Sequence, residues 1–126
     1  MKNKDKYILK HILKYCKQIE ETLNTYNNEK KAFLNNHIFK NAISMIIFQI
    51  GELSNHLKKE YKMETSNEIN WIEVSGMRNH FAHGYGDMDI NRIWDTAIND
   101  IPVLKKFCIK EIKRLDSAED KKEGND

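Results

Sequence analysis

Apolar residues recur at intervals of three and four over long segments of this chain, and this spacing constrains the possible fold most strongly. One stripe extends from Ile8 to Tyr26, and a second extends from Phe39 to Leu57. Such stripes are typical of amphipathic helices that pack nearly parallel to their neighbours. Because the chain has one proline and five glycines, the sequence predicts an all-α bundle of long helices without strands.

Capping residues predict where the first helices begin and end. Asp5 can cap a first helix that runs to about Tyr26, where a pair of asparagines stops it. After a short segment over residues 29–34, a second asparagine pair ending at Asn36 is a good cap for the next long helix. Residues 61–69 read as a polar connection without a clear apolar period.

The later helices have similar boundary signals. Asn70, followed three residues later by Glu73, forms a capping-box pattern, so a third helix should begin at Trp71. Gly84 is a natural terminator for this helix, because glycine adopts the left-handed backbone of a helix end at no steric cost.

A last helix should follow, capped by Asp87 or Asp89 and kinked or interrupted at Pro102, which lacks a backbone donor. Residues 116–126 are charged and almost free of apolar side chains, so we expect a disordered tail there. The sequence therefore predicts one helical domain over residues 1–115, followed by the tail.

Composition and charge are those of an ordinary soluble protein. Charged residues make up 32% of the chain and apolar residues 40%, as is usual for globular domains. The formal net charge of +2 permits phosphate binding but does not argue for it. Cys16 and Cys108 fall on apolar helical faces, so we expect reduced core residues in a cytoplasmic protein. We find neither a signal-peptide pattern nor a membrane-spanning run.

The ten residues that begin at Arg78 contain a guanidinium, a carboxamide, two imidazoles, a phenol and a carboxylate. Arg78 can donate two charge-assisted hydrogen bonds to a phosphate. His83 titrates near neutral pH, so it can give or take a proton. A continuous helix would separate these two residues by roughly 140°, and they converge better if the helix ends near Ala82. This segment is therefore the candidate site.

Two plainer interpretations of this segment stay open. In the first, Arg78 pairs with a surface carboxylate, His83 caps the end of the helix, and Tyr85 packs. In the second, His80 and His83 share a metal ion with a nearby aspartate. Two histidines without a third ligand at a fixed spacing are weak evidence for a metal, so we predict no metal site and no cofactor.

A longer comparison favours a catalytic interpretation. Three segments, in this order, resemble the HepT-like toxins of the HEPN superfamily: residues 40–53, 69–79 and 83–102. The first contains Ile50-Gly51-Glu52, which is similar to an Ile-Gly-Glu turn of that family. The family pattern R-x4-H-x-Y is present as Arg78, His83 and Tyr85.

This resemblance implies an up-and-down HEPN-like bundle of four to five helices that forms a homodimer. It implies a metal-independent endoribonuclease that acts as the toxin of a toxin–antitoxin pair, with RNA as substrate. Arg78 and His83 would be the catalytic residues, and Asn79 and His80 would support them. Tyr85 would be the site at which a partner nucleotidyltransferase antitoxin, of the MNT type, attaches AMP.

A second class of function also stays open. A non-catalytic helical module could bind a nucleotide or a partner protein and use the segment around Arg78 only to hold a phosphate. RNA cleavage that survives EDTA would distinguish the nuclease from this module. We expect no contact with membranes or DNA in either case.

Overall fold

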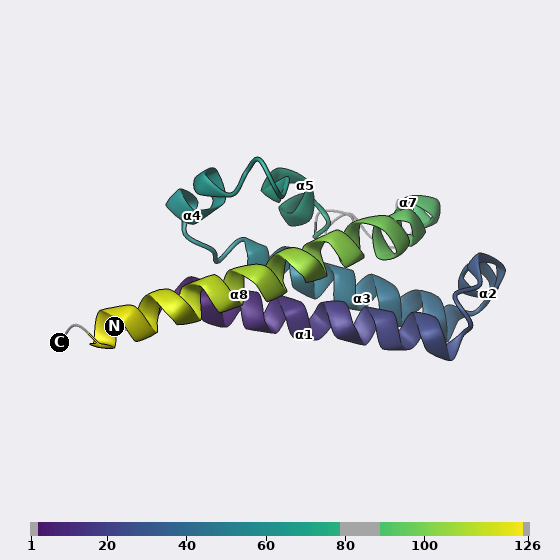
Figure 1. Ribbon diagram of the computed structural model, residues 1–126. Coiled ribbons are helices and arrows are strands. Elements are labelled where there is room, and N and C mark those ends of the chain that lie inside the picture. The colour runs from purple at the N-terminus through teal and green to yellow at the C-terminus, as the bar shows by residue number, and fades with distance from the viewer. Residues whose placement is uncertain (1–2, 79–88, 125–126) are drawn as a thin grey trace.

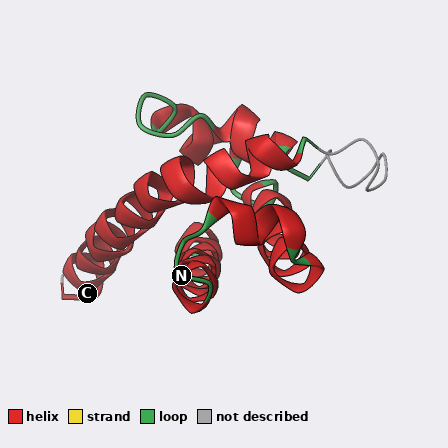
Figure 2. Ribbon diagram, turned by 90° about the vertical axis from the view of Figure 1, so that its right-hand side faces the viewer, coloured by secondary structure: helices red, strands yellow, loops and turns green. Residues whose placement is uncertain are grey.

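The computed structural model describes residues 3–78 and 89–124 of the protein (Figure 1). All regular elements among these residues are helices, and no strand occurs among them (Figure 2). The predicted all-α fold is therefore confirmed. No helix in this part of the chain is both long and apolar enough to cross a membrane.

Long helices form the body of the molecule. Helix α1 (Lys4–Thr25) packs against both α3 (His37–Ser54) and α8 (Ile101–Gly124). Figure 1 shows α3 and α8 running back along α1, so that the two ends of the chain lie at the same end of the bundle. Short helices connect the long ones: α2 (Lys30–Asn35), α4 (Lys59–Glu64), α5 (Trp71–Gly76), α7 (Ile90–Asp95) and the π-helical turn η2 (Thr96–Asp100).

The first cap differs from the prediction. The side chain of Asn3 caps α1 by accepting a hydrogen bond from the backbone N–H of Lys6. Asp5 is buried instead, and its carboxylate accepts a 2.9 Å hydrogen bond from the backbone N–H of Lys58, before α4. The sequence did not show this contact because the partner lies far along the chain.

The predicted stop of α1 is confirmed. Asn27 and Asn28 have φ angles of 57° and 55°, and the N–H of Asn28 bonds to the carbonyl oxygen of Leu23 at 2.8 Å. This is the left-handed helix end that asparagine tolerates better than most residues. Asn36 then caps α3 through the N–H groups of Ile38 and Phe39, also as predicted.

The hydrophobic core differs in detail from the predicted stripes. On α3 the fully buried positions include Ile43, Ile47 and Ile50, whereas Ile46 is only half-buried. Trp94 of α7 is buried within its own chain, where its ring lies 5.2 Å from the ring of Phe33. Trp94 is therefore part of the core of its own chain.

Both cysteines are free and buried, as predicted. Burial raises the pKa of the Cys16 thiol to about 12. The pKa of Cys108 is also raised, again chiefly by burial. Both thiols therefore stay protonated at neutral pH and are unsuited to act as nucleophiles.

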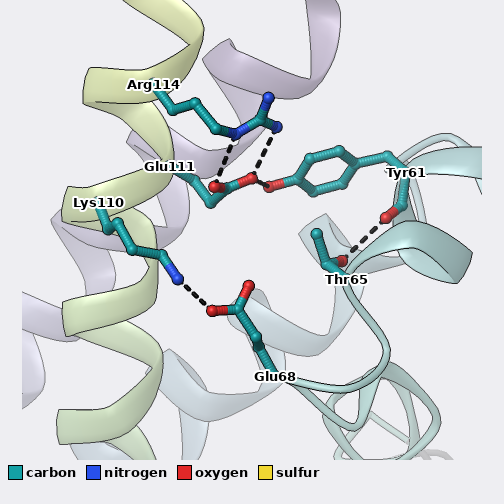
Figure 3. Close-up of polar contacts among 6 residues, drawn as sticks. All are labelled: Tyr61, Thr65, Glu68, Lys110, Glu111 and Arg114. Atoms are coloured by element: carbon teal, nitrogen blue, oxygen red, sulfur yellow. Dashed lines mark hydrogen bonds and ion pairs between the residues drawn. The ribbon is translucent and has the colours of Figure 1, made fainter.

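The predicted polar connection, residues 61–69, overlaps a short helix, α4. Tyr61 of this helix is buried, and its hydroxyl donates a 2.8 Å hydrogen bond to Glu111 of α8 (Figure 3). Arg114 binds the same carboxylate through two hydrogen bonds of 2.9 Å. One aromatic anchor fixes this short helix, and a single anchor gives no period for sequence analysis to detect.

The segment predicted as a disordered tail continues α8 through Gly124. Asp116 lies 3.0 Å from the ammonium group of Lys6, and Glu119 pairs with the same group. The partners of these carboxylates come from the first turn of α1. Long-range ion pairs thus join this charged segment to the bundle.

The last part of the chain follows the predicted boundaries. The side chain of Asp89 caps α7 by accepting a hydrogen bond from the N–H of Arg92. The α-helical pattern is interrupted over Thr96–Asp100, immediately before Pro102. A π-helical turn accommodates the missing backbone donor of proline, so the predicted interruption is confirmed.

Candidate active site around Arg78

Helix α5 carries the candidate site and is held on two sides. Asn70 caps its first turn by accepting a 3.2 Å hydrogen bond from the N–H of Glu73, as predicted. The indole N–H of Trp71 donates a 2.8 Å hydrogen bond to Thr65, and its ring packs edge-on against Phe107 of α8 at 5.7 Å. This one side chain thus fixes α5 relative to both α4 and α8.

Helix α5 ends earlier than predicted. Regular α-helix stops at Gly76, and the N–H groups of Met77 and Arg78 bond to carbonyl oxygens only three residues back, at 3.3 and 3.4 Å. These tighter bonds form a final turn of the 3₁₀ type. Gly84, the predicted terminator, lies outside the described residues. Arg78 is therefore presented from a turn.

Gly51 of α3 brings α3 and α5 into close contact at this point. A Cβ atom on Gly51 would lie 3.1 Å from both the backbone nitrogen of Arg78 and the carbonyl oxygen of Val74. The hydroxyls of Ser54 and Ser75 lie 3.1 Å apart across the same junction. The Ile-Gly-Glu segment is thus a helical contact site within α3 and not a turn.

Glu52, the next residue of α3, pairs with the candidate arginine. Its Oε1 atom lies 3.1 Å from Nε of Arg78. The side chains remain 37% and 47% exposed, respectively. An exposed pair of this kind contributes less than about 1 kcal/mol, and one carboxylate occupies only part of the five-donor guanidinium. The guanidinium is therefore oriented and remains accessible.

The other predicted site residues follow Arg78 in the chain. Four of them lie outside the described residues: Asn79, His80, His83 and Tyr85. Within residues 3–78 and 89–124, no three His, Cys, Asp or Glu side chains gather in a group that could hold a metal ion.

Two contributors to the site were missed by sequence analysis. Glu52 orients Arg78, and Gly51 allows the close approach that puts these residues together. A usable signal was present, because a glycine inside a strongly helical apolar run often marks a close packing contact. Its partner segment was not evident from the sequence.

The HepT-like family, described as "Ribonuclease HepT-like", matches residues 12–111, well over half of the chain. The chain belongs to the HepT-like ribonuclease family. This confirms the resemblance found in the sequence and the expectation of an enzyme of the ribonuclease class. The matched range contains the α3–α5 junction, so the site lies in the part of the chain that defines the family.

Individual relatives agree with this assignment. The chain is 32% identical over 104 residues to "Putative RNase TTE0752" of Caldanaerobacter subterraneus, covering 82% of this chain and 89% of the relative. It is 32% identical over 116 residues to "Putative RNase MJ1216" of Methanocaldococcus jannaschii, covering 91% and 93%. A third relative, "Probable ribonuclease HepT" of Thermococcus cleftensis, is 38% identical over 56 residues, covering 44% and 50%. No solved structure matches this HepT-like chain.

Proposed function

We propose that this HepT-like protein is a metal-independent endoribonuclease toxin that uses Arg78 and His83. The observation that carries the proposal is the position of Arg78, whose guanidinium is oriented by Glu52 and stays 47% exposed at a rigid helix junction. Membership of a ribonuclease family supports RNA as the substrate.

The chemistry that such a site can perform follows from RNA itself. The 2′-hydroxyl beside the scissile phosphate is the nucleophile, and His83 takes its proton as general base. The 2′-oxygen bonds to phosphorus, and the bond to the 5′-oxygen of the next nucleotide breaks. The departing 5′-oxygen takes a proton from water, which leaves a 5′-hydroxyl and a 2′,3′-cyclic phosphate. A positioned base contributes about 10²–10⁴-fold. Arg78 stabilises the charge on the phosphorane oxygens, usually a larger effect. Asn79 and His80 support this site.

A homodimer would place two copies of this sparse site together. Trp94 is buried and cannot contribute to a surface between subunits, so α3 is the candidate. Ile38 and Met45 on α3 remain 62% and 46% exposed, and Ile46 lies half-buried on the same helix. Apolar side chains gathered on one exposed face suit burial between subunits. Light scattering should therefore report a mass near twice 15.0 kDa, and a monomer at micromolar concentration would contradict the dimer.

Control of the toxin would act through Tyr85. A nucleotidyltransferase antitoxin removes the phenolic proton and transfers AMP from ATP to the phenolic oxygen, releasing pyrophosphate. The new phosphodiester anion would compete with RNA for Arg78. Intact mass after incubation with the antitoxin and ATP should rise by whole AMP units. An increase that persists in Tyr85→Phe would contradict this assignment.

Cleavage in the presence of EDTA tests the catalytic proposal. Purified protein should cut labelled RNA without added metal and leave 2′,3′-cyclic phosphate ends. His83→Ala should abolish cleavage, and His80→Ala should reduce it less. Products with 3′-hydroxyl ends or a requirement for Mg²⁺ would exclude this mechanism. Phosphate-dependent binding without any cleavage would instead favour the non-catalytic module.

A further inference from the structure

A groove opens beside Arg78, between α4, α5 and the end of α3. Its volume is about 950 Å³. Side chains that define this α4–α5 groove include Lys59, Lys62, Met63, Asn70, Ile72 and Arg78. The groove is therefore continuous with the arginine of the proposed site and extends from it along α4.

Among the described residues, the charged side chains that line the α4–α5 groove are all cationic. Its lining includes Lys59, Lys62 and Arg78, and no carboxylate from the described residues. In the part of the chain that the structure describes, neither lysine pairs with an acidic side chain. A groove with three cations and no lining anion attracts a polyanion.

Two acidic residues of the same segment, Glu64 and Glu68, lie toward α8. Glu68 pairs with Lys110 of α8 (Figure 3). Glu64 lies near Arg114, whose pKa is raised mainly by its hydrogen bond to Glu111 and also by the charge of Glu64. These two carboxylates thus face cations of α8, whereas Lys59 and Lys62 line the groove.

The wall that carries the lysines is fixed. The hydrogen bond from Tyr61 to Glu111 holds α4 against α8 (Figure 3). Thr65 donates a 2.8 Å hydrogen bond to the carbonyl oxygen of Tyr61 and accepts one from Trp71 of α5. Lys59 and Lys62 are therefore presented by a helix whose position is set relative to Arg78.

Apolar side chains complete the groove. Met63 is 67% exposed and Ile72 is 86% exposed. A surface that served only packing would not leave two apolar side chains this exposed. A single RNA strand offers phosphates to cations and unpaired bases to apolar surfaces at once, whereas a duplex hides its base faces. The mixed lining thus fits single-stranded RNA better than a duplex.

We propose that the α4–α5 groove binds a single-stranded RNA segment that flanks the phosphate held by Arg78. Lys59 and Lys62 contact successive phosphates, and Met63 and Ile72 contact bases. The choice of RNA as ligand rests on the proposed function. The position of the strand rests on the groove itself.

Binding measurements test this placement. Fluorescence anisotropy with a labelled single-stranded RNA, in the His83→Ala background to prevent cleavage, gives the dissociation constant at several salt concentrations. Lys59→Ala/Lys62→Ala should weaken binding about tenfold at low salt. The slope of log affinity against log salt should fall by about 1.4, because each phosphate contact to a single strand contributes roughly 0.7.

A matched control is available on α1. Lys14 and Lys17 are exposed and also three residues apart on a helix, and α1 lies across the bundle from α4 and α5 in Figures 1 and 2. Lys14→Ala/Lys17→Ala should change the dissociation constant less than twofold. Equal losses in the two double variants would overturn the proposal, because binding would then follow net charge alone.

Two further measurements separate the remaining outcomes. A photo-crosslinking residue in place of Met63 should capture the RNA strand, and one in place of Tyr7, an exposed α1 residue, should not. The reverse result, or a duplex of the same sequence binding as tightly as the single strand, would overturn the groove assignment. If the wild-type protein cleaves RNA but binding does not depend on Lys59 and Lys62, the groove proposal is refuted and the nuclease proposal stands. Lysine-dependent binding without wild-type cleavage supports the groove and refutes the nuclease.

Discussion

Two glutamate–arginine pairs in this molecule have the same chemistry but differ in the burial of the glutamate, since both arginines are about half exposed. Glu111 is 4% exposed and accepts hydrogen bonds from both Arg114 and Tyr61. Glu52 is more than a third exposed and makes one charged contact to Arg78 at 3.1 Å. A buried, fully bonded carboxylate cannot change partners cheaply, whereas an exposed pair can. The first pair therefore suits stability, and the second suits exchange with a phosphate.

Truncating the arginine of the exposed pair, Arg78, should have the largest effect on activity. Arg78→Ala should lower RNA cleavage by at least about 10²–10³-fold, because charge on the phosphorane loses its stabilising cation. The free energy of unfolding should change by less than about 1 kcal/mol. Single-turnover cleavage and urea denaturation measure these two quantities. Arg92→Ala, at an exposed position on α7, is the charge-matched control. If Arg78→Ala cleaves RNA within tenfold of wild type, the assignment of the Glu52–Arg78 pair to catalysis is wrong.

Truncating the other arginine should have the opposite profile. Arg114→Ala leaves the buried Glu111 carboxylate with fewer donors, which should lower the free energy of unfolding by about 1–3 kcal/mol. Cleavage by the folded fraction should stay within about threefold of wild type. A variant as stable as wild type but inactive would assign Arg114 to the functional site.

The same variant should alter the dependence of stability on pH. The hydrogen bond from Arg114 is the largest cause that lowers the pKa of Glu111, and the bond from Tyr61 adds to it. A lowered pKa in the folded state stabilises the protein above the unfolded-state pKa, about 4.3. That contribution is lost as the pH falls through the folded-state pKa. Denaturation curves between pH 6 and pH 3 should therefore be less pH-dependent in Arg114→Ala.

Forcing α3 and α5 apart beside the Glu52–Arg78 pair should have an intermediate effect on cleavage. Gly51→Ala would place a Cβ atom 3.1 Å from two backbone atoms of the α5 end. This overpacking should lower the free energy of unfolding by about 1–3 kcal/mol and reduce cleavage by displacing Arg78. Gly76→Ala is the matched control, since nothing lies within 4 Å of its Cβ position. Equal stability of the two variants would contradict the proposed close contact.

The smallest effect is expected from the partner of Arg78. Glu52→Gln should change the free energy of unfolding by less than about 1 kcal/mol. Loss of the competing charge should tighten RNA binding by up to about fivefold. Anisotropy in the His83→Ala background measures this change. Weaker binding would show that Glu52 mainly holds the guanidinium in place.

Local signals predicted much of the helical framework. The caps at Asn36, Asn70 and Asp89 and the stop at Asn28 each depend on residues within one turn of the chain, and each was found as expected. The cap at Asp5 failed because its carboxylate binds a distant backbone group.

For the candidate site, the sequence identified Arg78 but not its surroundings. Its partner Glu52 and the groove along α4 depend on how α3, α4 and α5 approach one another. Apolar spacing specifies which face of a helix is buried, but not which other helix covers it. The roles of the other four residues stay predictions made from the sequence pattern: Asn79, His80, His83 and Tyr85.

The sequence by itself determined the helical class, most helix boundaries, the burial of the cysteines and the family. Each of these depends on local spacing, capping chemistry or motif order. Only the tertiary structure decided that Gly51 lets α3 approach Arg78, that Tyr61 fixes α4 to α8, and that the lysines of α4 face a groove. These contacts join segments distant in sequence, so packing across the whole bundle sets them.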